Sequence, residues 1–367
     1  MNTIITWCLW LLLAETNLCA VQLIFRKREI KNKTRIIFSV TEFLFAAIFA
    51  VLVMAGPVML RKVQPLMTAL YAVLLPNAVI SLAYSVFLSV SKKKFKFRIN
   101  KCISVIFTVI FVLLGTVNSQ TISASYHTYS SSKLNSEHKF VFVSDIHYGN
   151  AQNKETVFEM VDNIKAEDPE FIILGGDVTD DYTTKEEMTE IFEYFAGDNS
   201  IPIYFIYGNH DRQPHCNYAN GQQYTVEELE NTLSECGIIL LQDDYAIISD
   251  DISLLGREDM SEKESRKDIS ALTTPLPSSY LIIADHQPVD VENNMNIGAD
   301  LQLSGHTHAG QMFPLKVFYN LLICDACGDY SYGDSNLNVS PGSSGWRFPF
   351  RTEAKCQYEV IKLTSTK

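Results

Sequence analysis

Five apolar segments of this 367-residue chain each end in Asp, Asn or His. The residues that follow them are Asp145 and His147 after "FVFVS", Asp177 after "FIILGG", Asn209, His210 and Asp211 after "YFIYG", His286 after "YLIIAD", and His306 and His308 after "LQLSG". The chain has only eight histidines. In open α/β sheets, ligands bind outside the carboxyl ends of the strands. The repeated pattern therefore predicts that these side chains form one site.

Two pairs within this set stand two positions apart in the sequence. In an extended segment, side chains at positions i and i+2 point to the same side. Asp145 and His147 could therefore face the site together, and so could His306 and His308. Gly305 allows the chain to bend sharply before the second pair.

The side-chain types suit metal ions. The candidate metal ligands are Asp145, His147, Asp177, Asn209, His286, His306 and His308. Imidazole, carboxylate and amide donors without thiolate favour Mn²⁺, Fe or Zn²⁺. A catalytic ion usually takes about three protein ligands, so seven suit two divalent ions that share a carboxylate. Such a pair can stabilise the attacking and leaving oxygens of a displacement at phosphorus.

Each of these residues taken alone has a structural interpretation, because Asp after a strand commonly caps a turn or a helix. The metal site is predicted from the set and not from any member. The structural interpretation is kept for three histidines outside the set, His127, His138 and His215. Cys324 and Cys327 are interpreted as a free or locally bonded pair, because no second pair at a suitable distance completes a zinc site.

From residue 139, short apolar runs alternate with polar segments of helical spacing. The segment "NKETVFEMVDNIKAE" places Val157, Met160, Val161 and Ile164 on one helical face. The order β-α-β-α-β favours parallel pairing. The runs after residue 237 are mostly strand-like, which favours two packed sheets over one doubly wound sheet.

The first part of the chain has a different composition. Residues 1–118 hold 14 Lys and Arg against three acidic residues, a net charge of +11, and the remainder carries −23. Three apolar runs, Ile4–Phe25, Ile36–Leu60 and Leu66–Val90, can each cross a membrane of ~30 Å. A fourth, Ile103–Val117, is short and needs Asn118–Ile122 to reach that length. We therefore expect about four transmembrane helices in residues 1–118, a linker in 119–138 and a catalytic domain in 139–367.

The loops around Arg26–Arg35 and Ser91–Lys101 each hold six basic residues. Positively charged loops stay in the cytoplasm, so four crossings would deliver the second part of the chain outside the cytoplasm, at the cell membrane. If the fourth run does not cross, that part lies in the cytoplasm. A domain of net charge −23 disfavours nucleic acid as a partner. The oligomeric state is not predicted.

The ordered motifs "DIH", "GGDVTD", "GNHD", "DHQP" and "GHTH" resemble the calcineurin-like metallophosphoesterases, with the tail Ala309-Gly310-Gln311 and Pro314 similar to a membrane-anchored bacterial branch. The resemblance covers Lys139 to about Leu363. It implies an α/β fold, a four-layer α/β/β/α sandwich that follows the all-α transmembrane bundle along the chain. Two sequence departures are Asp285, which could add charge next to His286, and Ala309 in place of a common glycine.

The resemblance also implies a role for each residue. Asp145, His147 and His308 would hold one metal ion, Asn209, His286 and His306 the other, and Asp177 would bridge them. His210 would assist departure of the alcohol, with Asp211 orienting it. The implied function is a membrane-tethered hydrolase of phosphodiester, phosphomonoester or diphosphate bonds, with a lipid-linked or cell-envelope phosphoester as the favoured substrate.

Two other functions compete with this one. A non-catalytic partner-binding module on the same fold would be expected to lose ligands, and none is missing here. A membrane sensor or transporter with an accessory phosphatase would depend on Glu15 and Glu42, which fall inside predicted spans where ionisable groups suggest function.

Overall fold

The computed structural model describes residues 11, 14, 32–55, 63–91, 97–150, 152–197, 200–215, 221–272 and 278–367. The chain divides into two compact units. The first comprises Met1–Val117 with the short segments Met312–Leu315 and Phe350–Thr352, and the second comprises Asn118–Gln311, Lys316–Pro349 and Glu353–Lys367.

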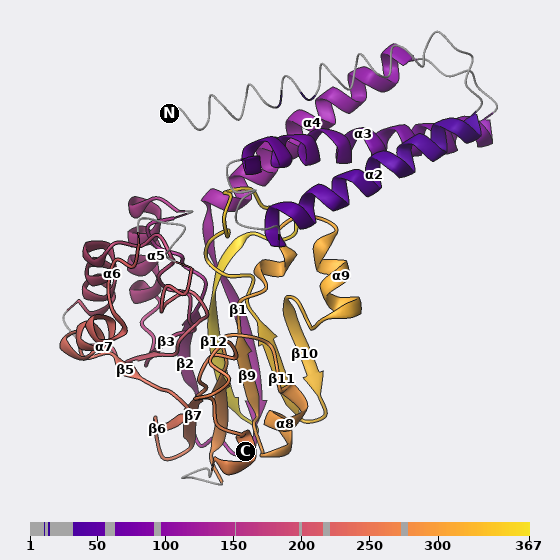
Figure 1. The fold of residues 1–367 in the computed structure, drawn as a ribbon. Coiled ribbons are helices and arrows are strands. Elements are labelled where there is room, and N and C mark those ends of the chain that lie inside the picture. Colours follow the sequence, from indigo (N-terminus) through magenta and orange to yellow (C-terminus); the bar gives the residue numbers. More distant parts are fainter. Residues whose placement is uncertain are drawn as a thin grey trace. The chain divides into compact units, whose positions relative to one another are not determined.

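Three long apolar helices, α2 (Asn32–Ala55), α3 (Gln64–Ser91) and α4 (Phe97–Gln120), precede the sheets (Figure 1). Their apolar stretches of 22, 28 and 22 residues are each long enough to cross a membrane. The fourth predicted run reaches that length because its helix begins at Phe97, earlier than the apolar run itself. The predicted span Ile4–Phe25 lies, apart from Leu11 and Ala14, outside the described residues.

One six-stranded sheet of the second unit has the order β1-β12-β2-β3-β4-β5. Its strands are β1 (Ile122–Ser131), β2 (His138–Val143), β3 (Ile172–Leu174), β4 (Ile203–Phe205), β5 (Ile239–Leu240) and β12 (Cys356–Ser365). Strands β2 to β5 are parallel neighbours. The helices α5 (Lys154–Ala166), α6 (Lys185–Ala196) and α7 (Val226–Glu235) connect them, as the alternating pattern predicted.

The other six-stranded sheet has the order β10-β11-β9-β8-β7-β6. It comprises β6 (Asp244–Ile247), β7 (Ile252–Gly256), β8 (Tyr280–Ala284), β9 (Leu301–Ser304), β10 (Gly328–Tyr332) and β11 (Ser335–Val339). Its short helical elements are η3 (Ile269–Ala271), α8 (Val291–Asn296), η4 (His308–Gly310) and α9 (Leu315–Leu322). Two mixed sheets therefore form the second unit, as the late strand-like runs predicted.

The alternation of side chains along β2 divides the core. Val141 and Val143 belong to a buried cluster with apolar residues of α5, α6 and α7. Phe140 and Phe142 point the other way, into a cluster that includes Ile282 of the second sheet. Both faces of the strand are therefore buried, which is why its sequence is a continuous apolar run.

The prediction of a linker in residues 119–138 is wrong for the ten residues of β1. This strand pairs in parallel with β12 over its whole length, from Ile122 opposite Cys356 to Ser131 opposite Ser365. It lies at the edge of its sheet. An edge strand of Ser, Thr and Tyr has no continuous apolar run, so its sequence resembles a linker although its backbone is paired.

Candidate metal centre

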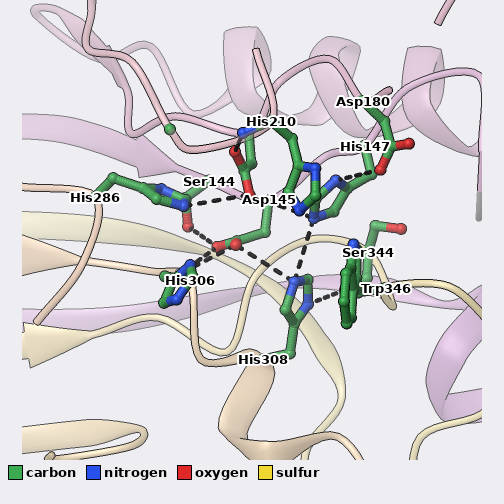
Figure 2. A network of polar contacts seen from close by, with 12 residues as sticks. Ser144, Asp145, His147, Asp180, His210, His286, His306, His308, Ser344 and Trp346 are labelled. Atoms are coloured by element: carbon green, nitrogen blue, oxygen red, sulfur yellow. Dashed lines mark hydrogen bonds and ion pairs between the residues drawn. The ribbon is translucent and has the colours of Figure 1, made fainter. Parts of the chain in front are cut away.

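The predicted site residues come together from both sheets. Each follows the carboxyl end of a strand within a few residues: Asp145 and His147 after β2, Asp177 after β3, Asn209 and His210 after β4, His286 after β8, and His306 and His308 after β9. Backbone hydrogen bonds join the loops, from the amide of His147 to the carbonyl of Asp177 (3.0 Å) and from Gly305 to His286 (2.8 Å). Figure 2 shows the histidines converging around Asp145.

The side chains form two groups, each able to hold an ion. One contains Asp145, His147 and His308, and the other contains Asp177, His286 and His306, with the potential ligand atoms of each group within 4.8 Å of one another. The Asp177 carboxylate oxygen Oδ2 lies 3.3 Å from His286 Nε2 and 3.7 Å from His147 Nε2. Asp177 therefore lies beside both groups, where a carboxylate shared by two ions must lie.

The rings of three histidines are oriented through Nδ1. This atom lies 3.0 Å from Asp180 Oδ2 in His147, 2.8 Å from the Gly175 carbonyl in His286 and 3.1 Å from the Ser344 carbonyl in His308. Outer partners of this kind set the ring orientation and the tautomer of metal-binding histidines. They leave Nε2 as the ligand atom directed toward the carboxylates.

The backbone of the site lies in the left-handed region. Asp145, His147, Asp177, His306 and His308 have φ between 46° and 66°. Non-glycine residues rarely adopt this conformation, which costs on the order of 1–3 kcal/mol where the surroundings enforce it. The expected extended i, i+2 geometry is therefore wrong, because tight turns aim these side chains. His306 and His308 accordingly fall in different groups.

Two glycines allow these turns to approach one another. A Cβ at Gly305 would collide with the Asp145 carboxylate and with Ser144, and one at Gly208 would collide with Asp177. The Gly305 neighbourhood also supplies a hydrogen bond, because the next amide, that of His306, donates to Asp145 Oδ1 at 3.0 Å. Glycine is thus required here for close packing around the two carboxylates.

Burial and charge make the residues suitable for cations. Asp145 and Asp177 are almost completely buried. Burial raises the pKa of Asp177, but the nearby histidines, His286 first, lower it well below its ordinary value. The side-chain oxygen of Asn209 is buried and has no hydrogen-bond partner within the described part of the chain. A buried acceptor without a donor is costly, so this oxygen and the surrounding donor set fit two divalent ions.

His210 is held by a carboxylate that sequence reasoning did not select. Its Nδ1 lies 2.9 Å from Asp181 Oδ2, and its ring contacts Trp346 with centroids 5.7 Å apart. Burial lowers the pKa of His210, but the charges of Asp177 and Asp181 raise it to about 9. With Nδ1 engaged, Nε2 is the nitrogen that can act on a substrate.

The expectation that Asp211 orients His210 is corrected by these contacts. The Asp211 carboxylate accepts hydrogen bonds from the amides of Gly208 (2.7 Å), Asp177 (2.8 Å) and Thr179 (3.0 Å). Burial raises its pKa to about 6. Asp211 therefore joins the loops after β3 and β4, and Asp181 takes the role of orienting His210. The signal that could have identified Asp181 is the pair of acids directly after the "GGDVT" motif.

The additional charge of Asp285 is balanced by a residue that no motif indicates. Arg266 donates to both oxygens of Asp285, at 2.6 and 3.1 Å, and also contacts Asp290. Burial raises the pKa of Asp285 to about 6 against the opposing effect of Arg266. The pair lies next to His286 and fixes the backbone there. The partners are nineteen positions apart in the sequence, so only the fold brings them together.

Three histidines and two cysteines, for which the structural interpretation was kept, belong to neither of the two ligand groups. His127 contacts Asp329 and Glu359, and His138 contacts Glu170 and Asp251. The ring of His215 lies 6.2 Å from that of His210, centroid to centroid. Cys324 and Cys327 form no disulfide with each other.

Comparison with known proteins gives a consistent result. Residues 138–310 match the model of the calcineurin-like phosphoesterases, a range that contains all seven predicted metal ligands. An uncharacterized metallophosphoesterase of Helicobacter pylori is 26% identical over 242 residues, which cover 63% of this chain and 61% of that protein. A "transmembrane protein with metallophosphoesterase domain" of Danio rerio is 27% identical over 61% of this chain and 53% of its own length. The chain thus spans less than two thirds of these relatives.

The relatives also include a metallophosphoesterase of Bacillus subtilis, YkuE, which is 26% identical over 62% of this chain and 79% of its own length. Among solved structures, TT1561 of Thermus thermophilus covers 56% of this chain with a TM-score of 0.38 and 13% identity. The resemblance to metallophosphoesterases therefore rests on the sequence matches and not on this distant structural likeness.

Proposed function

We propose that this chain, whose residues 138–310 match the calcineurin-like phosphoesterases, is a phosphoester hydrolase: a membrane-tethered enzyme with a two-metal site that acts on a lipid-linked phosphoester. The observation that carries the two-metal part is the pair of ligand groups that meet at Asp177. The membrane part is supported by three helices long and apolar enough to cross a bilayer.

We assign Asp145, His147 and His308 to one ion and His286, His306 and Asn209 to the other, with Asp177 shared. When bound, two divalent ions supply activation of water and stabilisation of charge on the phosphoryl oxygens. We propose the ions only as a class, Mn, Fe or Zn, because the donors suit all three.

His210 is the proposed acid. Asp181 Oδ2 holds Nδ1 of the ring at 2.9 Å, so Nε2 is the nitrogen that can donate a proton to the leaving oxygen. Trp346 lies against the same ring and shields it from solvent on one side. Together these residues would orient and protonate the leaving alcohol.

The substrate and location follow from the membrane helices. A site held close to a bilayer meets lipid phosphoesters at high local concentration, which favours a lipid or cell-envelope substrate. We place the domain outside the cytoplasm on the basis of the basic loops and a crossing by the fourth predicted segment, which lies in α4. A reporter fused after residue 135 tests this orientation.

The test of activity uses the full-length protein in detergent, loaded with Mn²⁺, on bis(p-nitrophenyl) phosphate. We expect Asp177→Asn and His210→Gln each to lower kcat by about 100-fold or more, because one removes the shared carboxylate and the other the acid. Asp244→Asn, an exposed carboxylate on β6, is the matched control and should change kcat less than twofold. Activity that survives both site substitutions would exclude the mechanism.

A further inference from the structure

Helix α9 presents an apolar face to solvent. Val317, Phe318, Leu321 and Leu322 are exposed, and Ile323 continues the surface past the last turn. The exposed fractions of Leu321, Leu322 and Ile323 are 73%, 78% and 70%. The first four positions recur at spacings of one, four and five, so they share one side of the helix. We call these five residues the α9 surface.

This surface is unusual for a water-soluble domain. Apolar residues scattered singly on a surface need no explanation, but a contiguous patch indicates an interaction site. The five side chains of the patch are uncharged, and residues 301–324 contain no Asp or Glu, although Glu353 accepts a hydrogen bond from the Lys316 amide at the start of the helix. An exposed apolar helix face of this kind suits the boundary between lipid headgroups and acyl chains.

The chain itself brings a bilayer to this unit. Three candidate spans precede the second unit, and only Thr121 separates the end of α4 from the start of β1. The first strand of the second unit is therefore covalently held at the end of a candidate span. A lipid surface is the partner that such a connection supplies at all times.

The α9 surface is connected to the metal-ligand loop. Thr307, which stands between His306 and His308, donates a hydrogen bond from its hydroxyl to the Ala326 carbonyl. The Ala326 amide in turn donates to the side chain of Asn320 within α9, at 2.9 Å. Helix α9 also begins only seven residues after His308. Whatever α9 contacts is therefore close, along the chain and through hydrogen bonds, to two proposed metal ligands.

We propose that the α9 surface inserts into the lipid headgroup and acyl boundary of the bilayer that the chain spans, as an interfacial anchor. The anchor would hold the site at the lipid surface, so that a phosphoester of a membrane lipid reaches it without leaving the bilayer. The second statement rests on the proposed lipid substrate; the insertion itself does not.

Insertion is tested on the full-length protein in phosphatidylcholine–phosphatidylglycerol vesicles. The Leu322→Trp variant adds a fluorophore to the α9 surface, and Ile247→Trp adds one at an exposed apolar position of β6 as the matched control. We expect lipids brominated on the acyl chain to quench the added emission of Leu322→Trp by at least half, with little effect on Ile247→Trp. The proposal would be overturned if aqueous iodide, and not the brominated lipids, quenched the added emission of both variants. It would also be overturned if the emission of Leu322→Trp changed only when the protein formed a dimer.

The consequence for catalysis is tested with Leu321→Glu/Leu322→Glu against Ile239→Glu/Ile247→Glu, which places the same charges on exposed apolar positions elsewhere. The α9 variant should lose at least tenfold in the rate on a lipid phosphoester in vesicles and keep its rate on soluble bis(p-nitrophenyl) phosphate. Equal losses on both substrates would contradict the anchor. If the unmodified protein hydrolyses neither substrate, the proposed function fails, and the quenching result still decides whether α9 inserts.

Discussion

Two of the clusters of histidine and carboxylate in the second unit differ in the backbone geometry that holds them. In one, His127 Nδ1 lies 2.8 Å from Asp329 Oδ2, and His127 Nε2 lies 2.7 Å from Glu359 Oε2. Asp329 accepts a further hydrogen bond from Asn338 (2.9 Å), and Glu359 accepts one from Ser340 (2.8 Å). We call this the His127 cluster.

The metal centre uses the same residue types and is arranged differently. Five of its seven proposed ligands have left-handed backbone, and the Asn209 oxygen is buried with no partner among the described residues. The His127 cluster has ordinary backbone at its members, although the Asn338 side-chain oxygen is likewise buried with no partner among the described residues. The same residue types thus occur in both clusters, and what separates them is the left-handed backbone of the metal centre, where four histidines and two carboxylates are gathered in two ligand groups.

The largest expected difference concerns glycine in the strained turns. Gly305→Ala should lower kcat/KM by about 1000-fold, or about 4 kcal/mol, because the added Cβ collides with Asp145. The control is Gly345→Ala, whose Cβ would meet neighbouring atoms only at 3.5 Å. Metal content by mass spectrometry should fall for the first variant alone. A fully active Gly305→Ala protein would show that the turn can relax, and the strain would then have no role in the site.

A smaller difference is expected between the two orienting carboxylates. Asp181→Asn should lower kcat by about 10–100-fold and alter the alkaline limb of its pH profile, because His210 loses the partner that holds Nδ1. Asp329→Asn makes the same change beside His127 and should leave kcat within about twofold. If the two variants have equal pH profiles, Asp181 acts through folding and not through His210.

The smallest effect concerns the stability of the His127 cluster. Burial lowers the pKa of His127, but Asp329 and Glu359 raise it more, to about 9 from an ordinary 6.5. A group whose pKa is raised in the folded state contributes stability that is fully present below its ordinary pKa. This contribution is lost as the pH rises through about 9. His127→Gln should therefore cost about 1–2 kcal/mol at pH 6 and much less at pH 10.

Denaturant unfolding of the full-length protein in detergent at both pH values measures this. The hydrolysis rate of His127→Gln should match that of the unmodified protein at pH 7, since the cluster lies outside the metal centre. A stability difference that is independent of pH would mean that packing, and not charge, is what the imidazole contributes.

Much of the fold could be predicted because strand and helix periodicity is local. The alternation around Val141 and Val157 indicated parallel strands with crossover helices, and the late runs indicated a second sheet. The strand β1 could not be predicted, because Ser123, Ser125 and their neighbours form a strand only by pairing with β12, more than 230 residues away. Domain boundaries near residues 118 and 139 remain predictions, and a fragment starting at 139 would lack β1.

The sequence by itself determined the proposed ligand set, because residue type and position after an apolar run are properties of short segments. Residue type and position did not group those ligands; only the family resemblance implied the two groups that the structure brings together. The left-handed turns separate His306 from His308, and long-range contacts select Asp181 for His210 and Arg266 for Asp285. The sequence likewise does not show that Leu321 and Leu322 are exposed. An apolar helix face is normally expected to be buried in the core, and only the tertiary structure shows that this one is uncovered. Each of these depends on which distant segments the two sheets bring together, and only the packed fold decides that.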